Sequence, residues 1–91
     1  MEHVAGPVNR GQVILYALST CIWCKKTRAL LEELGVAYDY EYVDLATPAR
    51  QAEIEGELAR LGGRPAYPTI VYEGTVVTGY RPDEIRRLLR V

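Results

Sequence analysis

The chain has 91 residues, of which 48% are hydrophobic, and a formal net charge of −1, which fits one small domain with a single core. This charge argues against a nucleic-acid partner, because no excess of cations is present to neutralise phosphates. No apolar run approaches the roughly 18 residues of a membrane span, and residues 1–12 lack the continuous apolar segment of a signal peptide. We therefore expect a protein that binds no membrane. The two cysteines at C-x-x-C spacing without an export signal fit a reducing cytosol, so we expect a cytoplasmic protein, and we also expect a monomer.

The first part of the chain combines an unpatterned segment with a strand and a helix. Residues 1–11 show no periodicity, so we expect a loose N-terminal extension ahead of a domain that spans residues 12–91. The short, continuously apolar run at residues 13–17 predicts a buried strand. A helix is predicted over residues 21–34, where leucines recur at helical spacing.

The rest of the chain is predicted to form a strand at residues 38–43, a helix from Pro48 that stops at Gly62, strands at residues 69–72 and 75–79, and a helix from Pro82. Alternating tyrosine and acidic residues in the first of these are typical of a half-exposed strand at a sheet edge. Thr47 supplies a capping hydroxyl ahead of Pro48, and Glu73-Gly74 favours a hairpin turn. The order β-α-β-α-β-β-α predicts an α/β fold with a four-stranded mixed sheet flanked by three helices.

The two cysteines, Cys21 and Cys24, lie where the first strand gives way to the first helix. Ser19 and Thr20 supply capping hydroxyls at this point. In the first turn, unpaired N–H groups and the helix dipole would stabilise a thiolate at Cys21. Lys25 stands four residues after Cys21, on the same helix face, so its charge is expected to act near the thiol. This context predicts a redox-active dithiol.

The cysteine pair has three alternative interpretations, namely a structural disulfide, half of a zinc site, and two inert core thiols. A zinc site needs about four ligands, and beyond the cysteines the chain offers only His3, so no metal is expected. A disulfide across two residues closes too small a loop to restrict the unfolded chain much. Cys24 could be an inert thiol in the core, whereas a cysteine in the first turn of a helix, such as Cys21, is hard to bury completely. Trp23 is expected to form part of a contact surface or to pack against a neighbouring loop.

The element order, the C-x-x-C motif and Tyr67-Pro68-Thr69 before the third strand resemble the glutaredoxin branch of the thioredoxin superfamily over residues 12–91. The resemblance implies a thioredoxin-like fold and a dithiol oxidoreductase that reduces protein disulfides and glutathione mixed disulfides. In this family Cys21 would be the nucleophile and Cys24 the resolving cysteine. Implied partners are disulfide-containing or glutathionylated proteins, with glutathione as reductant or co-substrate.

The resemblance also implies a set of residues in glutathione binding, namely Arg64, Tyr67, Pro68, Gly79, Tyr80 and Asp83. Pro68 matches the family's cis-proline, and the residue before it pairs through its backbone with bound peptide or glutathione. Arg64 falls where relatives carry a basic residue for a glutathione carboxylate. Residues 78–83 match the segment that holds the γ-glutamyl end in many members.

Departures from the family pattern leave the electron source open. Relatives usually carry a lysine where this chain has Leu18, and the pair between the cysteines is Ile22-Trp23 rather than Pro-Tyr. Residues 79–83 are also similar to glutaredoxin-like electron donors of ribonucleotide reductase, some of which are recharged by flavin-dependent thioredoxin reductase. Such a redoxin is therefore an alternative function. An iron–sulfur cluster carrier and a non-catalytic thioredoxin-fold binding module are further alternatives.

Overall fold

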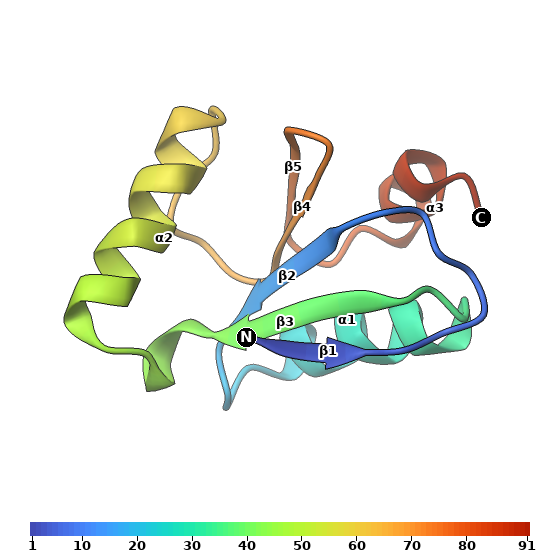
Figure 1. Cartoon of the computed structure of the whole chain (residues 1–91), viewed down its shortest axis with the longest axis horizontal. Coiled ribbons are helices and arrows are strands. Elements are labelled where there is room, and N and C mark those ends of the chain that lie inside the picture. Colours follow the sequence, from blue (N-terminus) through green and yellow to red (C-terminus); the bar gives the residue numbers. More distant parts are fainter.

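A central mixed sheet organises the computed structural model, which describes all 91 residues (Figure 1). The elements are β1 (Glu2–Val4), β2 (Val13–Ala17), α1 (Ile22–Glu33), β3 (Tyr38–Tyr42), the 3-10 helix η1 (Val43–Leu45), α2 (Pro48–Arg60), β4 (Thr69–Tyr72), β5 (Thr75–Thr78) and α3 (Pro82–Leu89). The strand order is β1-β3-β2-β4-β5. β2 and β3 run parallel, and the other neighbours are antiparallel. The predicted α/β fold with a mixed sheet and three α-helices is confirmed.

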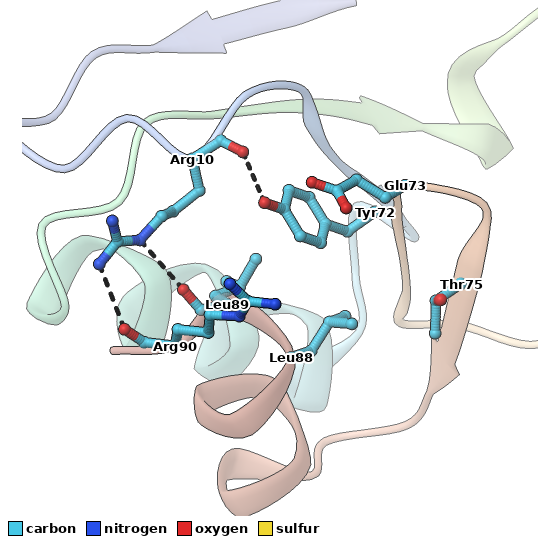
Figure 2. A pocket seen from close by; sticks show the side chains of 7 residues that line it. All are labelled: Arg10, Tyr72, Glu73, Thr75, Leu88, Leu89 and Arg90. Atoms are coloured by element: carbon cyan, nitrogen blue, oxygen red, sulfur yellow. Dashed lines mark hydrogen bonds between the residues drawn. The ribbon is translucent and has the colours of Figure 1, made fainter.

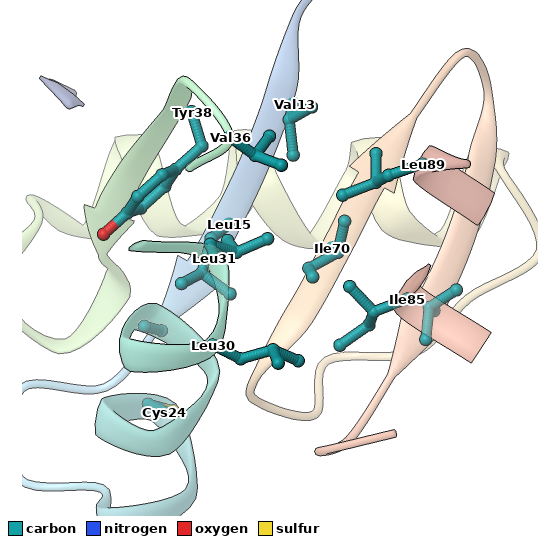
Figure 3. Close-up of a cluster of buried hydrophobic side chains, with 12 residues drawn as sticks. Val13, Leu15, Cys24, Leu30, Leu31, Val36, Tyr38, Ile70, Ile85 and Leu89 are labelled. Atoms are coloured by element: carbon teal, nitrogen blue, oxygen red, sulfur yellow. The ribbon is translucent and has the colours of Figure 1, made fainter. Parts of the chain in front are cut away.

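Two apolar clusters hold the helices against the sheet. The larger cluster joins α1 and α3 to the sheet and includes Leu31 and Ile85 (Figure 3). The second cluster packs α2 through Ile54. Successive side chains of a strand point to opposite faces, and β2 follows this rule, since Leu15 belongs to the first cluster and Tyr16 to the second. The sheet is therefore covered on both faces.

The N-terminal segment corrects two predictions, a loose extension and a four-stranded sheet. Glu2–Val4 forms β1, which pairs antiparallel with β3, so the sheet has five strands. β3 consequently lies between β1 and β2 and not at the predicted edge. Its polar side chains have partners in this inner position. Asp39 contacts His3 with 2.7 Å between Oδ1 and Nδ1, and Glu41 pairs with Arg50 of α2 at 2.8 Å.

Arg10 ties the end of this segment to the C-terminus of α3 (Figure 2). Its Nε donates to the carbonyl of Leu89 at 3.1 Å and its Nη2 to that of Arg90 at 3.2 Å. The Tyr72 hydroxyl donates to the carbonyl of Arg10 at 2.6 Å. The last carbonyls of a helix lack partners within the helix, so the arginine supplies hydrogen-bond donors to these carbonyls.

Local signals placed the other elements close to where they are found. The Thr47 hydroxyl accepts a hydrogen bond from Arg50 N at 3.1 Å and caps α2 as predicted. Glu73 and Gly74 have φ of 49° and 77°, the left-handed conformation that a two-residue hairpin turn requires. None of the helices combines the length and apolar character needed to cross a membrane.

Candidate active site

Cys21 is the N-cap of α1 and not a residue of its first turn. Its Sγ accepts a hydrogen bond from Cys24 N at 3.2 Å, which is the role that a capping hydroxyl fills in many helices. The prediction that Ser19 and Thr20 cap the helix is therefore wrong. The Ser19 hydroxyl instead donates to Asp44 at 2.5 Å, and Thr20 is exposed in the loop. The sulfur of Cys21 faces the open donors of the helix, where negative charge is favoured.

Cys24 has a different environment from Cys21, although both are free thiols. Cys24 is 1% exposed, while Cys21 is only partly buried. Leu18 N donates to Cys24 Sγ at 3.4 Å. Burial, reinforced by the hydrogen bond with Cys21, raises the pKa of the Cys24 thiol to about 12. One thiol is thus open to a substrate, and the other is shielded and protonated at neutral pH.

A pocket of about 290 Å³ includes Trp23 of the first turn of α1, and its lining residues are Trp23, Tyr67, Pro68, Gly79 and Tyr80. The Tyr67–Pro68 peptide is cis, in agreement with the match of Pro68 to the family's cis-proline. Half-exposed Trp23 lies with its ring centroid 5.7 Å from that of Tyr80. No charged side chain lines this pocket. It brings together four of the six residues implied in glutathione binding, along with Trp23.

Arg64 and Asp83 do not line this pocket. Arg64 is exposed and lines a separate pocket of about 330 Å³, which also includes Arg81 and Glu84. These two residues form an ion pair at 2.9 Å. Asp83 is exposed in the first turn of α3. Arg64 and Arg81 therefore belong to a different hollow from the aromatic side chains.

Lys25 and Lys26 of α1 make different contacts. Lys25 is exposed, and the contact that it makes with Cys21 is the helix bond from its N to the Cys21 carbonyl at 3.1 Å. Lys26 instead places its ammonium 4.9 Å from the centroid of the Trp23 ring, a favourable cation–π contact. Sequence reasoning missed this pair, although its i, i+3 spacing signals it. The hydrogen bonds between Ser19 and Asp44 were also not predicted, because 25 residues separate the two in the sequence.

A metal centre is not apparent among the side chains of the chain. No group of three or more His, Cys, Asp or Glu side chains is placed to hold an ion. What the geometry assembles is a pair of unequal thiols beside an uncharged, aromatic pocket. Such an arrangement can exchange thiols with a disulfide whose flanking groups occupy the pocket.

Comparison with known proteins places these features in a family. The glutaredoxin family model matches residues 13–77. A glutaredoxin-like 8.6 kDa protein of Clostridium pasteurianum is 29% identical over 75 residues, which cover 82% of this chain and 93% of that protein. The crystal structure of a glutaredoxin from Methanosarcina mazei Go1 matches with a TM-score of 0.89 and 43% identity, covering 97% of this chain and 85% of that one. The glutaredoxin-like NrdH-redoxin of Escherichia coli, described as having a thioredoxin-like activity profile, matches with a TM-score of 0.67 and 26% identity, covering 86% and 95%.

Proposed function

The chain belongs to the glutaredoxin family, and we propose that it is a dithiol oxidoreductase that reduces protein disulfides and glutathione mixed disulfides through Cys21 and Cys24. The observation that carries this proposal is the inequality of the two thiols. Cys21 Sγ accepts the Cys24 N–H at 3.2 Å at the open end of α1. Cys24 is 1% exposed and has a raised pKa. A nucleophile and a resolving thiol need this difference.

The proposed reaction has two exchange steps. The Cys21 thiolate attacks one sulfur of the substrate disulfide, forms a mixed disulfide and releases the other sulfur as a thiolate, which takes a proton from solvent. Cys24 then loses its proton and attacks Cys21 Sγ. The Cys21–Cys24 disulfide forms, and the substrate leaves fully reduced. Two glutathione molecules, themselves oxidised to glutathione disulfide, restore both thiols.

A glutathionylated protein allows a shorter route. Cys21 attacks the glutathione sulfur, and the protein leaves as a thiolate. A second glutathione then attacks the glutathione on Cys21 and releases glutathione disulfide, so Cys24 takes no part. In both routes the chain contributes thiolate stabilisation at the start of α1 and a docking surface at Pro68 and Tyr80.

Glutathione as the reductant requires partners for two carboxylates and an ammonium. We assign one carboxylate to Arg64, the other to backbone N–H groups from Tyr80 into α3, and the ammonium to Asp83. Proteins with disulfides, or with glutathione on a cysteine, are the proposed partners. The proposed glutaredoxin-like domain, residues 12–91, is completed by β1 of the N-terminal segment, and the cytoplasm is its proposed location.

A second candidate function is a redoxin that thioredoxin reductase recharges and that donates electrons to ribonucleotide reductase. Three observations favour it. The pocket at Trp23 has no charged lining residue, Arg64 lines a different pocket, and Leu18 stands where relatives usually carry lysine. The similarity to the NrdH-redoxin of Escherichia coli is consistent with it.

The two candidates make opposite predictions for one pair of assays. The first assay follows turnover of a small glutathione mixed disulfide with glutathione and glutathione reductase. The second follows reduction of the Cys21–Cys24 disulfide by thioredoxin reductase, and Cys21→Ser serves as the blank in both. Turnover in the first assay supports glutathione as the electron source. Activity in the second assay alone supports the redoxin, and no activity in either contradicts both.

A further inference from the structure

Both cysteines are hydrogen-bonded to Leu18 in the loop before α1. Cys21 N donates to the Leu18 carbonyl at 3.3 Å, and Leu18 N donates to Cys24 Sγ at 3.4 Å. The first bond is long for an N–H···O contact, and sulfur is a weak acceptor in the second. Neither bond is strong enough to hold the loop by itself. Together with the bond from Cys24 N to Cys21 Sγ, the position of Leu18 therefore helps to set how the two sulfurs approach each other.

Asp44 fixes the residue that follows Leu18. Ser19 N donates to Asp44 Oδ1 at 2.9 Å, and the Ser19 hydroxyl donates to Oδ2 at 2.5 Å. Hydrogen bonds to a carboxylate are roughly twice as strong as neutral ones. Ser19 N and the Leu18 carbonyl belong to one planar peptide unit. The Asp44 carboxylate thus holds the N–H of this peptide unit, and the carbonyl of the same unit accepts the hydrogen bond from Cys21 N.

Asp44 itself stands on a supported element. η1 carries Val43, which is buried against the sheet and α2. The side-chain amide of Gln51 in α2 donates to the carbonyls of Val43 and Ala46 at 2.9 and 3.2 Å. These bonds join η1 to α2 on both sides of Asp44. A continuous set of contacts therefore runs from α2 through η1 to the loop that carries the cysteines.

We propose that Asp44 is a positioning residue for the dithiol, because its carboxylate orients the Leu18–Ser19 peptide and thereby sets the approach of Cys24 to Cys21. The proposal rests on the proposed function, in which Cys24 attacks Cys21 Sγ within a mixed disulfide. Such an attack needs alignment, and a misplacement of about 1 Å costs a reaction up to ~100-fold in rate. Asp44 is exposed, so its substitution leaves the core intact.

The test isolates the step that Asp44 is proposed to assist. Reduced protein is mixed with the disulfide of thionitrobenzoate in a stopped-flow instrument. In the first phase Cys21 attacks, one thionitrobenzoate leaves and the other stays bound to Cys21. In the second phase Cys24 loses its proton to solvent, bonds to Cys21 and releases the second thionitrobenzoate as a thiolate. The two phases separate nucleophilic attack from resolution.

We expect Asp44→Ala to slow the second phase about tenfold and to change the first phase less than about twofold. Asp44→Asn should slow the second phase only about two- to threefold and leave the first phase unchanged, because an amide oxygen still accepts from Ser19 N, although more weakly than a carboxylate. Ser19→Ala should give an intermediate effect, since it removes only the hydroxyl bond. The rescue by Asn distinguishes positioning from a loss of general stability, which urea unfolding of each variant measures separately.

Asp39→Ala is the matched control, because it removes another hydrogen-bonded carboxylate whose partner, His3, lies away from the loop. It should leave both phases unchanged. A second phase at the wild-type rate in Asp44→Ala overturns the proposal, as does equal slowing in the Ala and Asn variants. Failure of the proposed function gives a separate result. The wild type itself would then lack the second phase, and no resolving step would exist for Asp44 to assist.

Discussion

The two ends of the sheet are held in contrasting ways. At the end where β2 begins, Arg10 and Tyr72 close the N-terminal segment over α3 with hydrogen bonds of 2.6, 3.1 and 3.2 Å (Figure 2). At the end where β2 finishes, the bonds from Leu18 to the two cysteines are 3.3 and 3.4 Å. The first end is closed by strong polar contacts. At the second end Asp44 holds the loop through Ser19 at 2.9 and 2.5 Å, while the two cysteines are held by the longer bonds.

The end of the sheet that carries the cysteines also exposes large apolar side chains. Ile22 and Trp23, which separate the cysteines, are 59% and 52% exposed. Two large apolar side chains exposed side by side next to Cys21 are consistent with contact to a substrate. The contrast indicates that one end supplies stability and the other keeps groups accessible for reaction. Substitutions at the two ends should therefore separate stability from activity.

The largest effect is expected at the dithiol end, from replacing one cysteine at a time. Cys21→Ser should abolish reduction of both protein disulfides and glutathione mixed disulfides, because the attacking sulfur is lost. Cys24→Ser should abolish only the reduction of protein disulfides and keep substantial deglutathionylation, which needs one thiol. Coupled turnover of each substrate measures this asymmetry. Equal loss of deglutathionylation in the two variants would contradict the one-thiol route.

The next largest effect concerns the pH dependence of Cys24 in the Cys21→Ser variant. Burial is the largest cause of the raised pKa of the Cys24 thiol, and it persists in this variant, so the pKa should stay above the ordinary value of about 8.5. Only the thiolate reacts, so alkylation should be slow at neutral pH and rise about tenfold per pH unit between about pH 8 and 10. The same variant in denaturant should instead level off near the ordinary pKa. A plateau near pH 9 in the native protein would show that Cys24 is not shielded.

A smaller effect is expected at Arg64, and it bears on the electron source. Exposed charged contacts contribute about 0–1 kcal/mol, so Arg64→Ala should raise the KM for glutathione by about two- to fivefold. The rate of Cys21 alkylation should not change. Arg60→Ala removes a nearby exposed arginine of α2 and serves as the control. An unchanged KM, together with efficient reduction by thioredoxin reductase, would favour the redoxin over the glutathione-dependent enzyme.

The smallest effect on activity is expected at the opposite end of the sheet. Arg10→Ala removes two side-chain hydrogen bonds to the end of α3 and should lower the free energy of unfolding by about 1 kcal/mol. For a domain of this size, that corresponds to a decrease in Tm of about 4–8 °C. Turnover at 25 °C should stay unchanged. Arg87→Ala, which removes an exposed cation from the last turn of α3, controls for charge, and a loss of turnover in Arg10→Ala alone would break the contrast between the ends.

Features with a local cause could be predicted from the sequence. The apolar run at residues 13–17 gave β2 with its observed bounds, Val13–Ala17. Thr47 before Pro48 gave the start of α2, and Glu73-Gly74 gave the turn between β4 and β5. In each case, neighbouring residues determine the conformation through burial, capping or backbone freedom.

Features that depend on distant residues could not be predicted. β1 is a three-residue strand with no pattern of its own, and it exists because β3 supplies its hydrogen bonds. Serine is a typical helix-capping residue, but the Ser19 hydroxyl donates to Asp44, which lies 25 residues away in the sequence. The helix α1 begins at Ile22, and Cys21 Sγ is its cap. Family resemblance supplied the cis form of the Tyr67–Pro68 bond, which chain pattern alone does not specify.

The central claim is that Cys21 attacks a substrate disulfide and that Cys24 releases the product. Mass spectrometry of protein mixed with a disulfide-containing protein substrate tests it most directly. Cys24→Ser should accumulate a covalent adduct whose disulfide maps to Cys21, Cys21→Ser should form none, and wild type should end as the Cys21–Cys24 disulfide with reduced substrate. An adduct that maps to Cys24, or accumulates equally in both variants, would contradict the account.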